Sequence, residues 1–388
     1  MMFGTTLVRA GKVLLRQAHK GLTYTPAQIV QAMYHGILDR APDEAGKDGL
    51  LGYLEAGGSL ERALREMLQS SESTMKRLQE VLPPHTLPDL RTIAPDRFST
   101  RRVGADTNLL FEASGAADFD LLETWIRTYR YYDVPGLWGA RIDLDKCVTA
   151  AIVEGLGARS CLEIGCFTGP VLSLLKERGI DVAGLDASHL AFVLAYPSIR
   201  NDMRFGDLLE VEFGRRFDAV VAMDILEHLN PNRFGRYLDR IADLLAPDGY
   251  LVLNSPMFGT DDMFGTVFPQ YIDEWRATGD ASHWNILDCD GNGWPKHGHL
   301  IWASPGWWEA TLARHGLVRD RDIEAMLQDR LAGFFATSSS RKCLFILKHA
   351  AGTQSSAAAI ARLEKTLGAV AGLPEGVPRH ARAGRGAS

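Results

Sequence analysis

Five short apolar runs follow one another between residues 160 and 254, and helix-length stretches separate them. Each run ends in a glycine or a polar residue. Runs of this length and spacing predict parallel β-strands joined by helices, because a crossover connection returns each strand to the same direction. The pattern therefore predicts an α/β, doubly wound, Rossmann-like sheet. The predicted strands are 160–164, 181–186, 203–207, 217–224 and 249–254.

The end of this domain has a different pattern. A helix over 305–315, a strand near 317–323 and a final strand over 342–348 are expected, so we place the domain at 105–350. Beyond residue 350 the chain becomes rich in Ala, Gly, Ser and Arg, which predicts a low-complexity tail over 351–388. Within that tail one helix is expected near 356–370.

The residues before this domain divide into three parts. Residues 1–24 form a basic segment, for which a frayed helix is favoured over a membrane or partner contact. Residues 25–80 predict a small all-helical domain, because Thr25 and Gln28 form a capping box and apolar residues then recur at helical spacing. Four prolines among polar residues predict a linker over 81–104.

Composition narrows the class of protein. The 388 residues are 46% hydrophobic, enough for a core, and the length favours two domains. A net charge of -6 and a pI near 6.0 argue against a nucleic-acid partner. Five cysteines without paired zinc spacing favour a reducing compartment, and no apolar run is long enough for a transmembrane segment. We therefore expect a cytoplasmic protein.

The first strand ends in a glycine turn, which is the most informative part of the chain. Glu163 precedes Gly165, and Cys166 and Phe167 lead on to Gly169. The glycines allow the backbone to approach a ligand and the next helix to begin close to the sheet. A dinucleotide fingerprint would need glycines at 167 and 170, where Phe167 and Pro170 stand, so a dinucleotide is disfavoured.

The turn resembles the first motif of the class I S-adenosylmethionine-dependent methyltransferases. That resemblance implies S-adenosyl-L-methionine as cofactor and the whole turn as its binding site, with Asp186 accepting from the ribose hydroxyls and Asp207 lying beside the adenine. Asp224 and the following 225–229 are similar to the signature after the family's fourth strand. The alternative is a non-catalytic scaffold or sensor, which Phe167 supports because it replaces the usual middle glycine.

Residues 25–80 are similar to a phycobilisome-linker-like helical domain found in bacterial proteins that build or decorate surface glycans. This resemblance implies an association module and a protein partner. It also links the enzyme to a small or glycan-linked acceptor, and O-methylation is the expected reaction.

The acceptor pocket is expected in the long insertion 256–304, since doubly wound folds bind ligands beyond the carboxyl ends of their strands. His228 and His299 are the candidate catalytic bases. Tyr131 and Tyr132 are candidates to cover the cofactor, although core packing is favoured for at least one of them. The aromatic residues of the insertion would form either stacking faces or a satellite core; they are Phe258, Phe264, Phe268, Tyr271, Trp275, Trp284, Trp294 and Trp302.

Two segments resemble metal sites, but neither is favoured, so no metal is expected. Asp288, Asp290 and Asn292 match the start of a calcium loop, but His299 stands where a bidentate glutamate is required. A polar turn is the simpler interpretation. Separately, Asp224 with Glu227 and His228 resembles the magnesium site of quinone O-methyltransferases.

Overall fold

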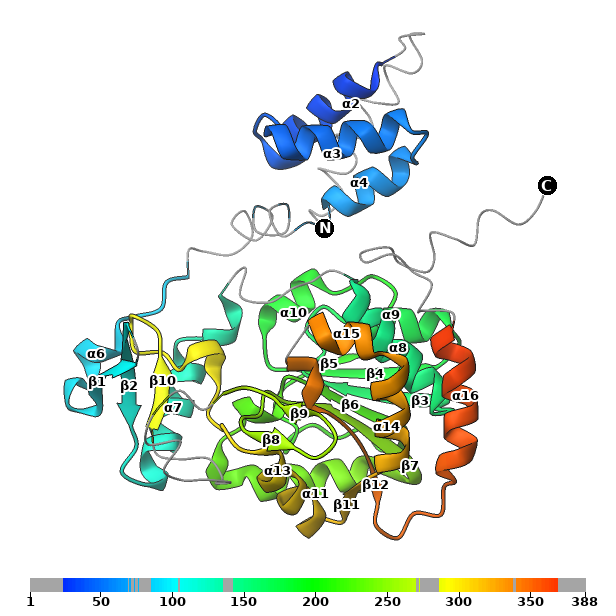
Figure 1. Ribbon diagram of the computed structural model, residues 1–388. Coiled ribbons are helices and arrows are strands. Elements are labelled where there is room, and N and C mark those ends of the chain that lie inside the picture. The colour runs from blue at the N-terminus through cyan, green and yellow to red at the C-terminus, as the bar shows by residue number, and fades with distance from the viewer. Residues whose placement is uncertain are drawn as a thin grey trace. The chain divides into compact units, whose positions relative to one another are not determined.

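The structure is a computed structural model that describes residues 24–68, 70, 73, 76, 85–103, 105–134, 142–269, 272, 286–337 and 340–368. It divides into two compact units (Figure 1). One comprises Met1–His85 with Pro135–Arg141, and the other Thr86–Val134 with Ile142–Ser388. The predicted basic segment lies outside the described residues, except for Tyr24, and so does the end of the predicted tail after residue 368.

The described part of the larger unit is built on a seven-stranded sheet with the order β11-β12-β7-β6-β3-β4-β5. The strands β3 to β7 are parallel, and β12 is antiparallel to both β7 and β11. This confirms the predicted doubly wound sheet, and β11 and β12 correspond to the two final strands that the sequence predicts. The bounds are β3 (Ser160–Ile164), β4 (Asp181–Asp186), β5 (Met203–Phe205), β6 (Phe217–Met223), β7 (Leu245–Asn254), β11 (Leu317–Arg319) and β12 (Leu344–His349).

Helices cover both faces of this sheet because its strands are apolar on both sides (Figure 1). One face packs against α8 (Leu144–Gly155), α9 (Pro170–Glu177), α10 (His189–Leu194), α14 (Arg321–Arg330), α15 (Ala332–Thr337) and α16 (Ser356–Gly368). The other packs against α11 (Phe234–Leu244) and α13 (Pro305–Arg314). Chain order reverses between β3 and β6, which makes the carboxyl ends of these strands the place where such a fold binds ligands.

The helix α16 is part of the fold. Its presence confirms the predicted helix, but the assignment of all of 351–388 to a low-complexity tail is wrong for residues 356–368. Ala359, Leu363 and Leu367 are buried in the same core as α8. Arg362 also donates hydrogen bonds to the carbonyls of Gly155 and Leu156, at the end of α8.

The predicted linker 81–104 is also wrong over most of its length. Residues of this segment form α6 (Leu90–Ile93), the 3-10 turn η2 (Pro95–Arg97) and β1 (Phe98–Val103). Pro95 is tolerated because it begins a turn, and Leu90 is fully buried. With β2 (Asp106–Glu112) and β10 (Ile286–Cys289), β1 makes a three-stranded antiparallel sheet in the order β1-β2-β10.

The lead-in to the central sheet, residues 105–134, contains β2, α7 (Ala116–Thr128) and the 3-10 turn η3 (Tyr131–Asp133). The insertion after β7 contributes β10 and a small hairpin of β8 (Thr260–Asp261) and β9 (Gly265–Thr266). The remaining 3-10 turns are η4 (Arg200–Asp202), η5 (Leu226–His228), η6 (Pro231–Arg233), η7 (Lys296–Gly298) and η8 (Ser340–Cys343).

The smaller unit is helical where it is described, as predicted for residues 25–80. It contains α2 (Pro26–Met33), the π-helical turn η1 (Tyr34–Leu38), α3 (Glu44–Glu55) and α4 (Leu60–Leu68). The capping box is confirmed, since Thr25 Oγ1 accepts from Gln28 N and Gln28 Oε1 accepts from Thr25 N. Its apolar core consists of Val30, Met33, Tyr34, Leu38, Ala63 and Met67.

Candidate active site

The turn after β3 has a backbone that demands glycine at two positions. Gly165 has φ +69, and a Cβ there would lie 1.9 Å from Ile225 Cδ1. Gly169 has φ +75, and its Cβ would lie 2.4 Å from Ile199 Cδ1. Both the left-handed conformation and the close approach therefore exclude a side chain. This is the tight strand-to-helix turn that the sequence predicts.

The turn is fastened to the neighbouring strand β4. The backbone N–H groups of Gly165 and Cys166 donate to the carbonyl of Leu185, at 2.8 and 3.1 Å. Phe167 has φ +44, an unfavourable value for a residue with a side chain, and its N–H donates to Asp186 Oδ2 at 2.7 Å. That hydrogen bond holds the strained residue in place. Cys166 is buried as a whole, and its backbone N–H and carbonyl are both hydrogen-bonded within the turn, to Leu185 and Gly169.

Asp186 lies at the end of β4 and links the turn to the next helix. Its Oδ1 accepts from Ser188 N at 2.7 Å, while Oδ2 accepts from Phe167 N. Desolvation raises the pKa of this carboxyl to about 6. A carboxylate offers about four acceptor positions, so those that the backbone N–H groups of Phe167, Ser188 and Ala187 leave unused are available to a ligand.

Glu163 is the buried acidic residue of the turn, with 6% of its surface exposed. Burial raises the pKa of its carboxyl to about 8. Its Oε2 is buried without a hydrogen-bond partner. An unpaired buried carboxyl is costly, so this oxygen fits a site whose polar ligand supplies the missing donor.

Asp207 follows β5 on the same edge of the sheet, since Gly206 N donates to the carbonyl of Asp186. Three donors already reach its carboxylate. Arg127 Nη2 and Tyr237 Oη donate to Oδ2 at 2.6 and 2.7 Å, and Leu209 N donates to Oδ1 at 2.9 Å. Asp207 thus ties α7 to the central sheet, and a ligand at this position would share the carboxylate with these groups.

Asp224 follows β6 with φ +55, and its N–H donates to the carbonyl of Asn254 at 2.8 Å. Asn254 Nδ2 and Arg341 Nη1 donate to its two carboxylate oxygens, at 2.5 and 2.7 Å. Arg341 also contacts Asp145. Sequence reasoning missed Arg341, because nothing in a pattern relates residue 341 to the end of β6.

The two candidate bases lie close together in the structure. The ring centroids of His228 and His299 are 4.9 Å apart. The backbone brings them close: the carbonyl of Glu227 accepts from the N–H groups of Leu300 and Ile301, at 2.8 and 2.9 Å. Burial lowers the pKa of His228 to about 4 and holds the pKa of His299 well below its usual range, so both imidazoles are neutral near pH 7.

Glu227 completes this cluster and is fully buried. Its Oε1 lies 3.9 Å from His228 Nε2 and 3.8 Å from His299 Nε2, while its Oε2 accepts from Ser255 Oγ at 2.7 Å. Among the described residues, Glu227, His228 and His299 are the group whose ligand atoms, all within 4.8 Å of one another, could hold a metal ion. The sequence showed Glu227 only as part of a motif.

The aromatic residues of the insertion mainly form a core. Trp294 is fully buried and stacks on Tyr131 at 5.3 Å, and Phe258 packs in a small cluster with Leu110. The satellite-core alternative is therefore the correct one for these residues. Tyr132 lies against His228 at 5.7 Å and Trp302 against His299 at 5.3 Å. Tyr271, Trp275 and Trp284 lie outside the described residues.

The calcium-like loop forms a polar turn. Asp288 accepts from Lys296 Nζ at 2.7 Å and from Asn108 Nδ2 at 3.1 Å. Asp290 Oδ1 accepts from the N–H groups of Asn292 and Trp294. These contacts occupy the carboxylates that a calcium ion would need.

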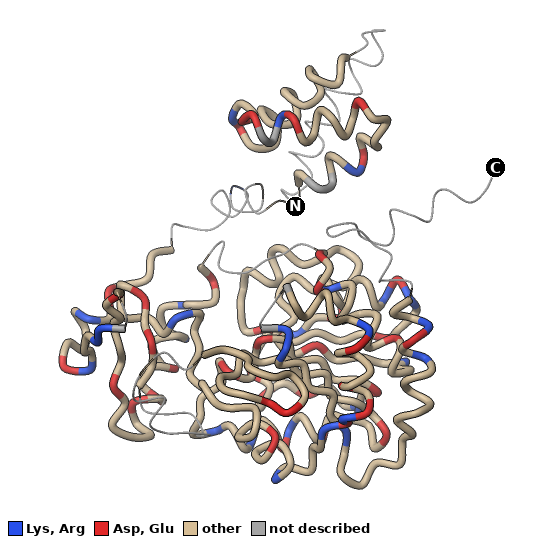
Figure 2. The backbone as a smooth tube through the Cα atoms, viewed as in Figure 1, with Lys and Arg blue, Asp and Glu red and all other residues tan. Residues whose placement is uncertain are grey.

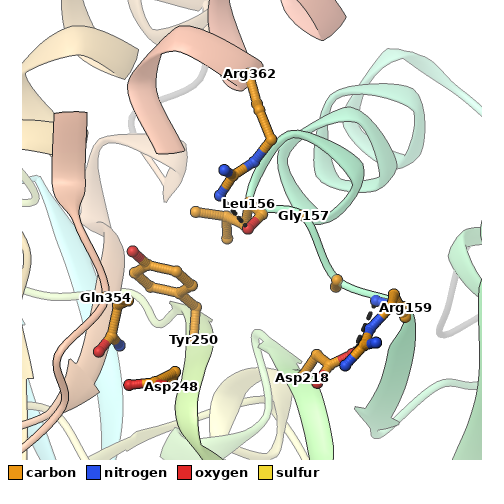
Figure 3. Close-up of a pocket in the computed structure, with 9 residues that line it drawn as sticks. Leu156, Gly157, Arg159, Asp218, Asp248, Tyr250, Gln354 and Arg362 are labelled. Atoms are coloured by element: carbon orange, nitrogen blue, oxygen red, sulfur yellow. Dashed lines mark hydrogen bonds and ion pairs between the residues drawn. The ribbon is translucent and has the colours of Figure 1, made fainter. Parts of the chain in front are cut away.

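A separate pocket of about 200 Å³ lies at the other edge of the sheet (Figure 3). Residues at the amino-terminal ends of β3 and β6, with Tyr250 of β7 and Arg362 of α16, line it. Figure 3 shows Arg159 beside Asp218 and Arg362 reaching Leu156. The pocket is thus formed where α16 docks, away from the carboxyl ends of the strands.

Comparison with known proteins agrees with this geometry. Residues 140–318 match the family model of the methyltransferase domain. This methyltransferase-like domain contains every strand from β3 to β7 and the predicted cofactor-binding and catalytic residues, whereas Tyr131 and Tyr132 precede it.

Two curated relatives share parts of the domain. An uncharacterized methyltransferase of Staphylococcus carnosus is 27% identical over 100 residues, which are 26% of this chain and 48% of that protein. A ubiquinone biosynthesis O-methyltransferase of Bradyrhizobium diazoefficiens is 29% identical over 136 residues, 34% of this chain and 53% of that protein. The chain thus spans about half the length of the curated relatives it matches.

Among solved structures, the 1,6-didemethyltoxoflavin-N1-methyltransferase of Burkholderia thailandensis is 16% identical to the chain. The match covers 64% of this chain and 96% of that one, with a TM-score of 0.37. Within the described residues no helix is long and apolar enough to cross a membrane. In the larger unit, basic and acidic residues are interspersed along the chain (Figure 2).

Proposed function

We propose that the protein is an S-adenosylmethionine-dependent methyltransferase that acts on a small-molecule acceptor. The observation that carries this proposal is the turn after β3. Its two glycines with left-handed φ and its hydrogen bond to Asp186 place a tight strand-to-helix turn at the switch point of the sheet, where such folds bind ligands. The match of residues 140–318 to the methyltransferase domain supports the same activity.

The cofactor would lie along the carboxyl ends of β3, β4 and β5. The turn from Gly165 to Gly169 would pack against its methionine part, with the Glu163 carboxylate facing the positive charges of the amino group and sulfonium. Asp186 would accept from the ribose hydroxyls with the oxygen lone pairs that Phe167 and Ser188 leave unused. Asp207 and Asp224 would act mainly as anchors, because neighbouring side chains already donate to them.

The acceptor would lie on the side of His228 and His299. Methyl transfer is an in-line displacement, so the protein must orient the acceptor and, for a hydroxyl group, remove its proton. Two neutral imidazoles can accept a proton there. The Bradyrhizobium relative, named as a ubiquinone biosynthesis O-methyltransferase, supports oxygen as the methylated atom. A glycan-linked acceptor, a protein partner for residues 25–80 and a cytoplasmic location stay predictions.

A non-catalytic scaffold is the second candidate. It is favoured by Phe167, whose side chain stands at a strained position where glycine would let a ligand approach more closely. A scaffold would keep the fold without needing a cofactor.

Binding of S-adenosylmethionine and S-adenosylhomocysteine, measured by calorimetry, tests the proposal. We expect micromolar affinity in the wild type and more than about tenfold weaker binding in Asp186→Ala, which removes the ligand's acceptor and frees Phe167. Asp181→Ala is the matched control, because Asp181 lies at the opposite end of β4 and pairs with Arg215 on the surface. A well-folded wild type that binds neither compound would favour the scaffold.

Transfer itself is then measured with a methyl-labelled cofactor and a panel of small hydroxylated and amino compounds. Label that appears only in hydroxyl acceptors supports O-methylation, whereas label in amines alone contradicts it.

A further inference from the structure

Arg341 ties three distant segments together at the carboxyl edge of the central sheet. It lies in η8, directly before β12, and 14% of its side chain is exposed. Its Nη1 donates to Asp224 Oδ2 at 2.7 Å, and its Nε and Nη2 each lie 3.1 Å from Asp145 Oδ2. One guanidinium group therefore joins the end of β6, the first turn of α8 and the start of the last strand.

The two segments that Arg341 joins both adjoin the turn proposed to hold the cofactor. Ile225, at the end of β6, packs so closely on this turn that a Cβ at Gly165 would lie 1.9 Å from its Cδ1. Lys146, in the first turn of α8, acts on Glu163, where its charge opposes the rise in pKa that burial causes. The guanidinium group thus lies on the side of the site where the methionine part of the cofactor is expected.

The three side chains carry unequal charges. Asp145 and Asp224 contribute two carboxylates and Arg341 one cation, so one negative charge remains in excess. Asn254 donates to the second oxygen of Asp224 and adds no charge. Without Arg341 the excess would double at a partly buried place, where charges interact more strongly than in water.

Charge matters at this place because methyl transfer changes the charge of the cofactor. S-adenosylmethionine has a cationic sulfonium, whereas its product S-adenosylhomocysteine has a neutral thioether. Negative charge beside the sulfonium stabilises the substrate but not the product. Stabilisation of the ground state alone does not accelerate the transfer. A cation that offsets the carboxylates limits this stabilisation.

We propose that Arg341 is a positioning residue for the methyl donor. It holds Asp145 and Asp224 in place and offsets their charge, so that the protein does not bind the cationic cofactor far more tightly than the neutral product. The inference rests on the proposed function, because it requires the cofactor to lie at the turn after β3. It goes beyond the role of Asp224 as an anchor, since it assigns the charge balance of the site to a residue at the start of the last strand.

The ratio of two affinities tests the inference. Calorimetry at one pH gives the dissociation constants of S-adenosylmethionine and S-adenosylhomocysteine for the full-length wild type and each variant. In Arg341→Met we expect the ratio to shift toward S-adenosylmethionine by about fivefold or more, because a positive charge is lost. Asp145→Asn removes a negative charge instead, so it should shift the ratio toward S-adenosylhomocysteine.

Further variants separate charge from shape. Arg341→Lys keeps the charge and should leave the ratio within about twofold of the wild type. Arg341→Met combined with Asp224→Asn restores the wild-type charge balance and should bring the ratio back. Arg330→Met is the matched control, because Arg330 pairs with Glu364 on the exposed surfaces of α14 and α16.

Each outcome is decisive once circular dichroism shows that the variants are folded. Equal losses of affinity for both compounds in Arg341→Met would show a purely structural role and overturn the inference, and so would an unchanged ratio. If Arg341→Met does not fold, an unchanged ratio in Asp145→Asn overturns the charge argument. Wild-type protein that binds neither compound would overturn the proposed function itself, whereas binding with an unchanged ratio in the variants overturns the inference alone.

Discussion

If Glu163 faces the cofactor as proposed, its buried carboxyl makes cofactor affinity depend on pH. Its pKa of about 8 means that at pH 7 only about one molecule in ten of the free protein carries the ionised form. S-adenosylmethionine is a cation, so it would bind the ionised form and lower this pKa. The ionisation cost at pH 7 is about 1.4 kcal/mol, and it falls by the same amount for each unit of pH up to about 8.

The expected result is an affinity that rises about tenfold per pH unit from pH 6 to 7.5 and levels off above pH 8. Binding at pH 7 should release about 0.9 proton per cofactor, if the bound carboxyl titrates below pH 6. Glu163→Gln keeps the shape of the side chain and removes its titration. In this variant both the slope and the proton release should shrink to the contribution of the cofactor's own amino group.

Calorimetry in two buffers with different ionisation enthalpies gives the number of protons released. The difference between wild type and variant isolates Glu163, because the ligand's titration is common to both. Equal pH profiles for the two proteins would refute the reasoning. Wild-type affinity that falls from pH 6 to 7.5 would refute it as well, since the sign would be opposite.

Three further predictions concern stability, and each is measured as the free energy of unfolding in denaturant. Gly165→Ala should lower the free energy of unfolding by about 2–4 kcal/mol, because it combines a left-handed φ with a clash against Ile225. Gly179→Ala, where φ is +78 but the space is open, should lower it by only about 1–2 kcal/mol. Equal losses for the two variants would contradict the close-approach argument. Leu363→Ala should lower the free energy of unfolding by about 2–5 kcal/mol, because it opens a cavity between α16 and α8. Lys365→Ala, at an exposed position of the same helix, should lower it by less than about 0.5 kcal/mol. A Leu363→Ala variant as stable as the wild type would show that α16 does not stabilise the core. Because folding raises the pKa of Glu163, the ligand-free protein should lose stability as pH rises from about 4.5 through about 8. Glu163→Gln, which does not titrate, should therefore be more stable than the wild type at pH 9 but not at pH 4.5. A variant that is less stable than the wild type at both pH values would contradict this linkage.

The sheet and half of the site could be predicted because their signal is local. Each strand from β3 to β7 is a short apolar run, and the residue that ends it is adjacent in sequence. Parallel strands place those ends on one edge, which is why His228 could be expected near the turn at Gly165. The glycine requirement at 165 and 169 is likewise a property of the local backbone.

The errors arise where a partner is remote. Four prolines suggested a linker over 81–104, yet β1 of that segment pairs with β2, and β2 pairs with β10 at the far side of the domain. The Ala-, Gly- and Ser-rich composition after residue 350 predicted a tail, yet Leu363 of that segment packs into the same core as α8. Arg341 reaches Asp224 across 117 positions. The spacing of apolar residues shows which face of a helix or strand is buried, but not which other part of the chain packs against that face.

The two halves of the site are therefore supported by different parts of the chain. The cofactor turn is held within the central sheet by Leu185 and Asp186. His299 belongs to the insertion, whose strand β10 is attached to β2 of the lead-in. Hydrogen bonds from Leu300 and Ile301 to Glu227, and between His228 and Gly298, connect this part of the insertion to the end of β6. Changes in the lead-in can therefore move the acceptor side while the cofactor turn keeps its geometry. Such a division would let the acceptor vary without loss of cofactor binding.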